Sequence, residues 1–207
     1  MNTNFLNSVT NFLKKRTFEF IGLILISAGI GLAIAFATYS PEDPSFVYGD
    51  REFEIKNFFG IYGSSIADFL LQSFGLVSFL ILANLLFWGI NLIIQKKIKR
   101  IVFKLFLVVS YLVLGTIFIY ITSNNSFWLI DNGNSGFVGK IGYNFLSAWF
   151  PYIDNTYSAY GLLLLTIIFF IFSADLNIKK IITGTFSIIA SLFRRKENTI
   201  PDVNLEA

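Results

Sequence analysis

Four apolar runs with almost no charge dominate this sequence and limit what it can fold into. They cover Phe20–Tyr39, Gly75–Ile94, Ile101–Thr122 and Tyr157–Ser173. The only charged residue in the third run is Lys104, near its start. The fourth run is long enough to span a membrane if its helix begins near Asn155. A helix needs ~20 apolar residues to cross the hydrocarbon core of a bilayer. Only 14% of the chain is charged, against ~25% in soluble domains, so we predict an all-α integral membrane protein with four transmembrane helices.

The positions of the basic residues predict the orientation of these helices. Thirteen of the 16 Lys and Arg residues lie in the N-terminal segment, the loop around 95–104 and the C-terminal segment. The loops 40–60 and 123–156 contain only three basic residues, which are Arg51, Lys56 and Lys140. By the positive-inside rule both termini are cytoplasmic and these two loops are outside. This alternation fits four spans, and it favours a topological role for the basic segments over nucleic-acid binding.

The first span does not have the features of a cleavable signal peptide, because its apolar core is longer than the ~7–15 residues of such signals. We therefore expect a cytoplasmic N-terminal tail over 1–19, a four-helix membrane domain over 20–175 and a cytoplasmic segment over 176–207. Isoleucines and leucines recur at helical spacing between 178 and 193. This pattern predicts an amphipathic helix on the inner leaflet, followed by the start of a linker.

A Gly-x-x-Gly motif at 60–63 recurs at 136–139, an offset of 76 residues. Each copy is followed by apolar residues at helical spacing and ends in Phe before a helix breaker, at 74–75 and 150–151. We interpret this as two tandem hairpins, each made of a span, an outer loop, a short amphipathic outer segment and a second span. Chance similarity in a Phe- and Leu-rich chain is the alternative, and residues 64–94 could instead form one long helix.

The composition excludes several kinds of chemistry. The chain has no Cys and no His, which removes disulfides, thiolate nucleophiles, imidazole bases and nearly all zinc sites. Segment 133–140 resembles a phosphate-binding loop, but Asn134 stands at its first glycine position and Ile141 replaces the hydroxyl residue after Lys140. We predict no catalytic residue, no metal site, no cofactor and no ATPase activity.

A few polar residues and glycines in or near the spans are candidates for a role. Asp68 is a functional candidate because ionisable groups near membrane segments are costly, but a carboxylate that caps a helix or pairs with Lys56 or Lys140 is the favoured interpretation. Asn84 and Asn91 are expected to bond between helices rather than to line a transport pathway. Glycines in the first span are expected to permit close helix packing; these are Gly22, Gly29 and Gly31.

Three segments of the first half together resemble a known family. They read Tyr-Ser-Pro-Glu-Asp-Pro-Ser at 39–45, Asn-Phe-Phe-Gly-Ile-Tyr-Gly at 57–63 and Ala-Asp-Phe-Leu-Leu-Gln-Ser-Phe-Gly at 67–75. This pattern closely resembles the N-terminal four-helix membrane domain of the FtsK/SpoIIIE DNA translocases, the septal DNA pumps of bacteria. The resemblance is strong over 20–94 and compatible over the rest. It implies a membrane anchor, a linker and a cytoplasmic ATPase motor that forms a hexamer on DNA; we expect this chain to be the anchor alone.

From this resemblance we expect an anchor in the bacterial inner membrane at the division septum. It would tether the motor, self-associate, contact other division proteins and reach DNA only through the motor. The alternative is a small oligomeric transporter or channel, which a polar stripe along the spans would favour; we see no such stripe. The residues expected to matter form turns and helix starts at the outer side: Pro41, Asp43, Pro44, Asn57, Gly60, Gly63, Asp68 and Gly75.

Overall fold

A computed structural model describes residues 3–45, 54–97, 100–126, 128–129, 131–176 and 183. The described residues form α-helices and one short 3-10 helix, and none of them lies in a strand. This confirms the predicted all-α fold class. The chain divides into a unit Met1–Asp175 and a unit Leu176–Ala207. The amphipathic helix expected between 178 and 193 lies outside the described residues, except for Thr183.

Four helical stretches of the described residues are long and apolar enough to cross a membrane. Three of the spans are single helices: α1 (Thr3–Ala37), α4 (Ile101–Ser123) and α6 (Thr156–Ser173). The predicted bounds of the third and fourth spans hold to within one residue, and Asn155 caps α6 by accepting a hydrogen bond from the Tyr157 backbone N–H. Helix α1 begins well before the predicted span. Its 35 residues extend about 52 Å, farther than the ~30 Å hydrocarbon core.

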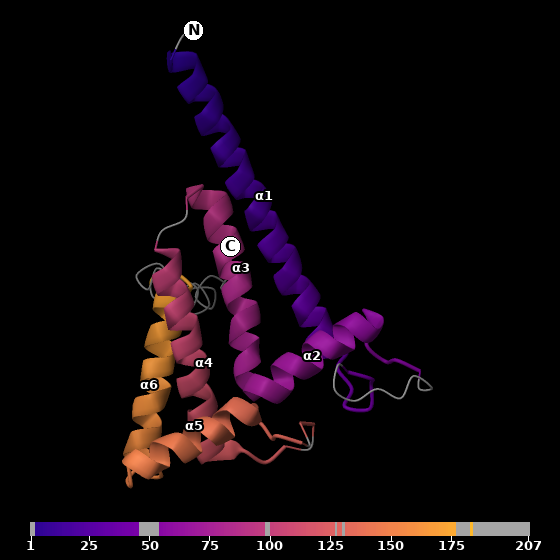
Figure 1. Ribbon diagram of the computed structural model, residues 1–207, viewed down its shortest axis with the longest axis vertical. Helices are drawn as coiled ribbons and strands as arrows, with labels where there is room; N and C mark the ends of the chain where they lie inside the picture. Colours follow the sequence, from indigo (N-terminus) through magenta and orange to yellow (C-terminus); the bar gives the residue numbers. More distant parts are fainter. Residues whose placement is uncertain are drawn as a thin grey trace, which may run out of the picture. The chain divides into compact units, whose positions relative to one another are not determined.

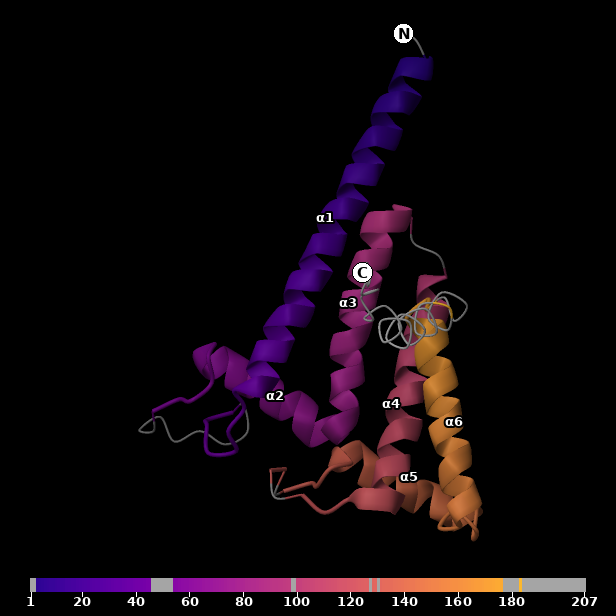
Figure 2. The same cartoon turned by 180° about the vertical axis from the view of Figure 1, so that it is seen from behind.

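The remaining span consists of α2 (Gly60–Phe74), a 3-10 turn (Gly75–Val77) and α3 (Ser78–Gln95). Gly75 has a φ of 55°, which a continuous helix cannot contain, and α2 points away from the axis of α3 (Figure 1). The alternative of one long helix over 64–94 is therefore wrong. Helix α5 (Gly136–Trp149) occupies the corresponding place before α6. Both α2 and α5 lie across the ends of the long helices (Figure 2).

The long helices form two hairpins, as the sequence predicts. Helix α1 packs against α3 in the first hairpin, and α4 packs against α6 in the second. Gly22 and Gly89 bring α1 and α3 together, because a Cβ added to Gly22 would lie 2.8 Å from the Gly89 carbonyl oxygen. Gly29 is similarly close to Leu86. The expectation for Gly31 is wrong: no described atom lies within 4 Å of a Cβ there, because this side of α1 faces a groove rather than α3.

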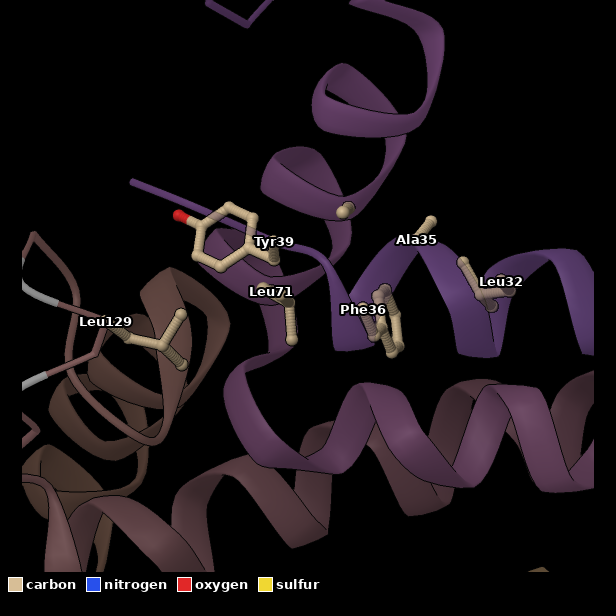
Figure 3. Packing of buried hydrophobic residues seen from close by; sticks show 7 residues of the cluster. Leu32, Ala35, Phe36, Tyr39, Leu71 and Leu129 are labelled. Atoms are coloured by element: carbon tan, nitrogen blue, oxygen red, sulfur yellow. The ribbon is translucent and has the colours of Figure 1, made fainter. Parts of the chain in front are cut away.

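Each amphipathic helix packs on the first helix of its own hairpin, and α2 also contacts α5. A buried apolar cluster lies where the end of α1, helix α2 and the loop of the second hairpin meet (Figure 3). Its members come from the end of α1, from α2 and from the loop of the second hairpin: Leu32, Ala35, Phe36, Tyr39, Ala67, Leu71 and Leu129. Because Leu129 belongs to the second hairpin, the core of the first hairpin is completed by the second. We call this end of the molecule, which carries segments 38–59 and 124–135, the loop end.

Candidate functional site

The loop of the first hairpin is held by the carboxylate of Asp43, which is only 8% exposed. Its Oδ1 accepts a hydrogen bond from the Lys56 backbone N–H (2.9 Å), and its Oδ2 accepts one from the Asn57 N–H (2.8 Å). Pro44, also buried, uses its carbonyl oxygen to accept a hydrogen bond from the Ser64 hydroxyl (2.7 Å). Pro41 is exposed. Residues 43–44 therefore fasten the start of the loop to its end and to α2.

Asn57 links the end of α1 to the start of α2. Its Nδ2 donates to the carbonyl oxygen of Ala35 (2.9 Å), which the end of α1 leaves without a helical partner. Its Oδ1 accepts from the Phe59 backbone N–H (3.1 Å). A Cβ on Gly63 would lie 2.1 Å from this Oδ1. The Asn57 side chain can therefore take this position only because residue 63 is glycine.

The two positive-φ glycines of α2 have different roles. Gly60 (φ 60°) begins the helix, and its N–H donates to the Asn57 carbonyl oxygen (2.9 Å). Gly75 (φ 55°) ends it, and a Cβ there would lie 1.9 Å from the Asn134 carbonyl oxygen. The neighbouring Leu76 N–H donates to that same oxygen (2.9 Å). Gly75 thus permits a backbone-to-backbone contact between the two hairpins.

Asp68 accepts a hydrogen bond from the Tyr39 hydroxyl (3.0 Å), so the expected ion pair with Lys56 or Lys140 is not what the structure shows. Lys56 pairs with Glu42 instead. The Tyr39 hydroxyl also accepts from Gln72 (3.2 Å). Burial raises the pKa of Tyr39 well above its usual range, with Asp68 contributing to the rise. The phenol therefore stays protonated and holds the end of α1 to α2.

The corresponding residues of the second hairpin were not predicted from the sequence. The Asn124 Oδ1 accepts from the backbone N–H (3.2 Å) and the hydroxyl (2.7 Å) of Ser135. The Asn134 Nδ2 donates to the carbonyl oxygens of Ser123 and Asn125. The only signal in the sequence was the polar cluster at 123–126, which a loop needs in any case. Asn132 donates to the Gln72 Oε1 (2.9 Å) and adds a polar link to the first hairpin.

At the opposite end, polar groups of α3 reach the second hairpin. The Asn84 Nδ2 donates to the Ser173 hydroxyl (2.9 Å), and the Asn91 Nδ2 donates to the Ala174 carbonyl oxygen (3.0 Å). The indole N–H of Trp88 donates to the Ser173 carbonyl oxygen (2.7 Å). These bonds confirm the prediction that both asparagines bond between helices. Among the residues that the structure describes, no group of three His, Cys, Asp or Glu side chains could hold a metal ion.

Five of the eight predicted site residues lie together around the start of α2: Asp43, Pro44, Asn57, Gly60 and Gly63. Asp68 lies farther along α2 and bonds to Tyr39 after the end of α1. Gly75 directly follows α2 and faces the second hairpin. The arrangement is polar bonding between backbone and small side chains. It positions the start of α2 against the end of α1 and against the loop before it.

Comparison with known proteins gives a family match over most of the chain. The family described as the 4TM region of DNA translocase FtsK/SpoIIIE matches residues 14–185. Among curated proteins, the DNA translocase FtsK of Azospirillum brasilense is 32% identical over 94 residues, covering 45% of this chain and 15% of the relative. The DNA translocase FtsK of Rickettsia prowazekii is 39% identical over 69 residues, covering 33% of this chain and 9% of the relative. The DNA translocase FtsK of Rhizobium meliloti is 29% identical over 134 residues, covering 64% of this chain and 15% of the relative. The matches thus span a small part of each relative, and no solved structure matches.

Proposed function

This chain belongs to the family of 4TM regions of the DNA translocases FtsK/SpoIIIE, and from this premise we propose that it tethers a translocase motor to the membrane at the division site. It is a multi-pass protein of the bacterial inner membrane. The observation that supports the proposal most is the family match over 14–185, which includes all four candidate spans apart from the first residues of α1. Residues 20–175 act as the membrane domain, and 1–19 and 176–207 lie in the cytoplasm.

Fractionation of cells that produce the motor with and without this chain at its N-terminus tests the tethering. The motor should sediment with inner membranes only when the chain is attached. A variant in which an unrelated four-span protein replaces the chain separates simple anchoring from a specific role. If both fusions restore chromosome partition equally well, the chain serves only as a membrane attachment and the proposed contacts with division proteins are wrong.

Septal location is tested by a fluorescent fusion of the chain alone. Enrichment at the division site supports contacts with other septal proteins, whereas uniform labelling of the envelope contradicts them. The purified chain should hydrolyse no ATP, because segment 133–140 lacks the first glycine and the hydroxyl residue of a phosphate loop. ATP turnover that persists after removal of contaminating ATPases would contradict this.

Orientation can be measured cleanly because the chain has no Cys. The exposed Lys97 and Asp131 lie at opposite ends of the helices. The split of basic residues favours position 97 inside and position 131 outside. A membrane-impermeant thiol reagent added to whole cells with a permeable outer membrane should label Asp131→Cys and spare Lys97→Cys. The reverse labelling would invert the topology.

The family resemblance and the small residues of α1 also support self-association of the chain in the membrane. Small residues such as Ala28 and Ala33 suit helix contacts, but polar pairs in membranes contribute only about 0.6 kcal/mol each. We therefore expect clusters of several copies without a strictly fixed number. Photobleaching of labelled chains in sparse vesicles counts the copies, and single steps in nearly all particles would contradict self-association.

A further inference from the structure

A cleft between the two hairpins lies at the end of the molecule opposite the loop end, where α3 ends and α4 begins (Figure 1). It has a volume of about 200 Å³. Apolar side chains form most of its walls: Ile21 and Leu25 from α1, Leu92 from α3 and Ile101 from α4. Ile101 is the first residue of a candidate membrane span. The cleft therefore lies where the spans meet the headgroup layer of a bilayer.

Three charged side chains also line this cleft: Lys97, Lys104 and Asp175. Lys104 lies one turn inside α4, its side chain is only 13% exposed, and it pairs with Asp175. A lysine ammonium has three N–H donors, so Lys104 can bind a second acceptor beside that carboxylate. Because a charge inside a span is costly to bury, a further anionic acceptor would stabilise it.

Lys97 supplies a positive charge that no described carboxylate neutralises. The neighbouring Lys96 pairs with Glu19 of α1, which also pairs with Arg16. Lys97 is exposed and has no ion-pair partner among the residues that the structure describes. The charged side chains that line the cleft therefore carry a net positive charge. This charge favours a ligand with a net negative charge over a zwitterionic one, whose own ammonium Lys97 would repel.

The apolar walls decide what kind of anion fits the cleft. A free phosphate ion would lose water against hydrocarbon side chains that offer it no hydrogen bond. A phospholipid carries a phosphate next to its acyl chains, just as the cleft places two lysines next to Ile21 and Leu25. Basic pockets between transmembrane helices bind anionic headgroups in this way. The combination of lysines and apolar side chains thus points to a lipid rather than to a soluble anion.

We propose that this cleft binds one anionic phospholipid from the leaflet at this end of the spans. The phosphate lies between Lys97 and Lys104, and one acyl chain follows the apolar wall that α1 provides. The lipid then links α1 of the first hairpin to α4 of the second, at the opposite end from the contact of Leu76 with Asn134. The proposal goes beyond the tethering role, and the orientation proposed above decides only which leaflet supplies the lipid.

Quenching of Trp88 by brominated lipids tests the proposal at the cleft itself, because this indole is part of the cleft wall. Trp128 and Trp149 are replaced by Phe, so that Trp88 is the only tryptophan left. The full chain is reconstituted in phosphatidylcholine vesicles with a small, equal mole fraction of brominated phosphatidylglycerol or brominated phosphatidylethanolamine. One unpaired lysine predicts a preference of about five-fold for the anionic lipid.

Two pairs of variants separate the cleft from the rest of the surface. Lys97→Gln should abolish the preference, whereas Lys15→Gln should keep it, because Lys15 is exposed on α1 and lies outside the cleft. Ile21→Phe narrows the apolar wall and should weaken quenching by both lipids. Leu23→Phe is its control, because Leu23 is 56% exposed and lies outside the cleft. The second pair keeps the proposal testable if Lys97→Gln folds poorly.

Equal quenching by the two lipids, or an equal loss of preference in both lysine variants, would mean that only general attraction to a basic surface operates, and would overturn the proposal. Loss of the preference when inorganic phosphate is added at constant ionic strength would assign the cleft to a soluble anion instead. Absence of quenching by either lipid would show that another group, such as segment 176–207 of this chain, covers the cleft. Fractionation and thiol labelling test the tethering and the orientation separately, so these failures are distinguishable.

Discussion

In the first hairpin the carboxylate of Asp43 fastens the loop to the turn before α2. In the second hairpin the side-chain amide of Asn124 does this before α5. The first loop, 38–59, is longer than the second, 124–135, and it uses additional bonds from Asn57 and Ser64. In both hairpins the glycine at the start of the short helix has a positive φ, and its N–H donates to the carbonyl oxygen three residues earlier. The backbone geometry at the membrane boundary is therefore the common requirement, and different side chains can satisfy it.

Gly75→Ala should break the contact between the hairpins and have the largest effect. The new Cβ would lie 1.9 Å from the Asn134 carbonyl oxygen at a φ of 55°. Clash and backbone strain together should lower the free energy of unfolding by about 3 kcal/mol, measured by denaturant unfolding in detergent. Gly161→Ala is the control, because a Cβ there meets no described atom within 4 Å. Equal stability of the two variants would mean that the hairpins do not depend on this contact.

Asp43→Ala and Asn124→Ala compare the two loop fasteners. Loss of the charged acceptor leaves the N–H of the buried Asn57 and the half-buried N–H of Lys56 without this partner and should cost about 2 kcal/mol. Loss of the neutral acceptor should cost about 1 kcal/mol. Asp43→Asn, which keeps the shape and loses the charge, should fall between them in the same unfolding assay. If Asn124→Ala proves the more damaging, charge is not what distinguishes the two loops.

Tyr39→Phe removes the hydroxyl that links α1 to α2 and should cost about 1 kcal/mol. Tyr143→Phe removes a hydrogen bond to the exposed Asp154 in the second hairpin and should change thermal stability less. Burial raises the pKa of Tyr39, so the folded chain keeps its proton after the unfolded chain loses it near pH ~10. Stability should therefore fall above about pH 10, and this fall should be smaller in Tyr39→Phe. An unchanged alkaline profile would contradict the role of Tyr39.

Lys56→Ala should have the smallest effect. The pair of Lys56 with Glu42 holds the pKa of the Glu42 carboxyl below its usual value, yet both side chains are mostly exposed. Exposed ion pairs contribute little to stability because water and salt screen them. The melting temperature should match that of the unmodified chain at low and at high salt. A salt-dependent loss would show that this exposed pair, and not only Asp43, secures the first loop.

The spans and hairpins follow from the sequence because hydropathy and loop charge are summed over many residues. The bounds of α4 and α6 were predicted on this basis, and the short helices α2 and α5 were predicted from apolar residues at helical spacing. The start of α1 at Thr3 was not, since a helix that continues past the bilayer leaves no apolar signal. The bent span was predicted as one of two alternatives, and only the φ of Gly75 decides between them.

The residues of the candidate site were named from the sequence, but their hydrogen-bond partners were not. Asp68 carries a charge, so the lysines were the natural expectation, but the Tyr39 hydroxyl is closer once α1 and α2 cross. Asn124 and Ser135 have no distinctive pattern, because a polar residue in a polar loop is ordinary. Their role depends on which backbone groups the fold leaves unpaired, and this is determined only when both hairpins are in place.

The position of Leu129 in the core of the first hairpin also orders events during synthesis. Leu71 and Ala67 are completely buried, in a cluster that Leu129 helps to close. The Leu76 N–H likewise finds its acceptor only in Asn134. When the ribosome has delivered α1 to α3 to the membrane, these groups still lack their partners. The first hairpin should therefore remain a substrate for insertases and membrane proteases until Leu129 and Asn134 have been synthesised and have reached it.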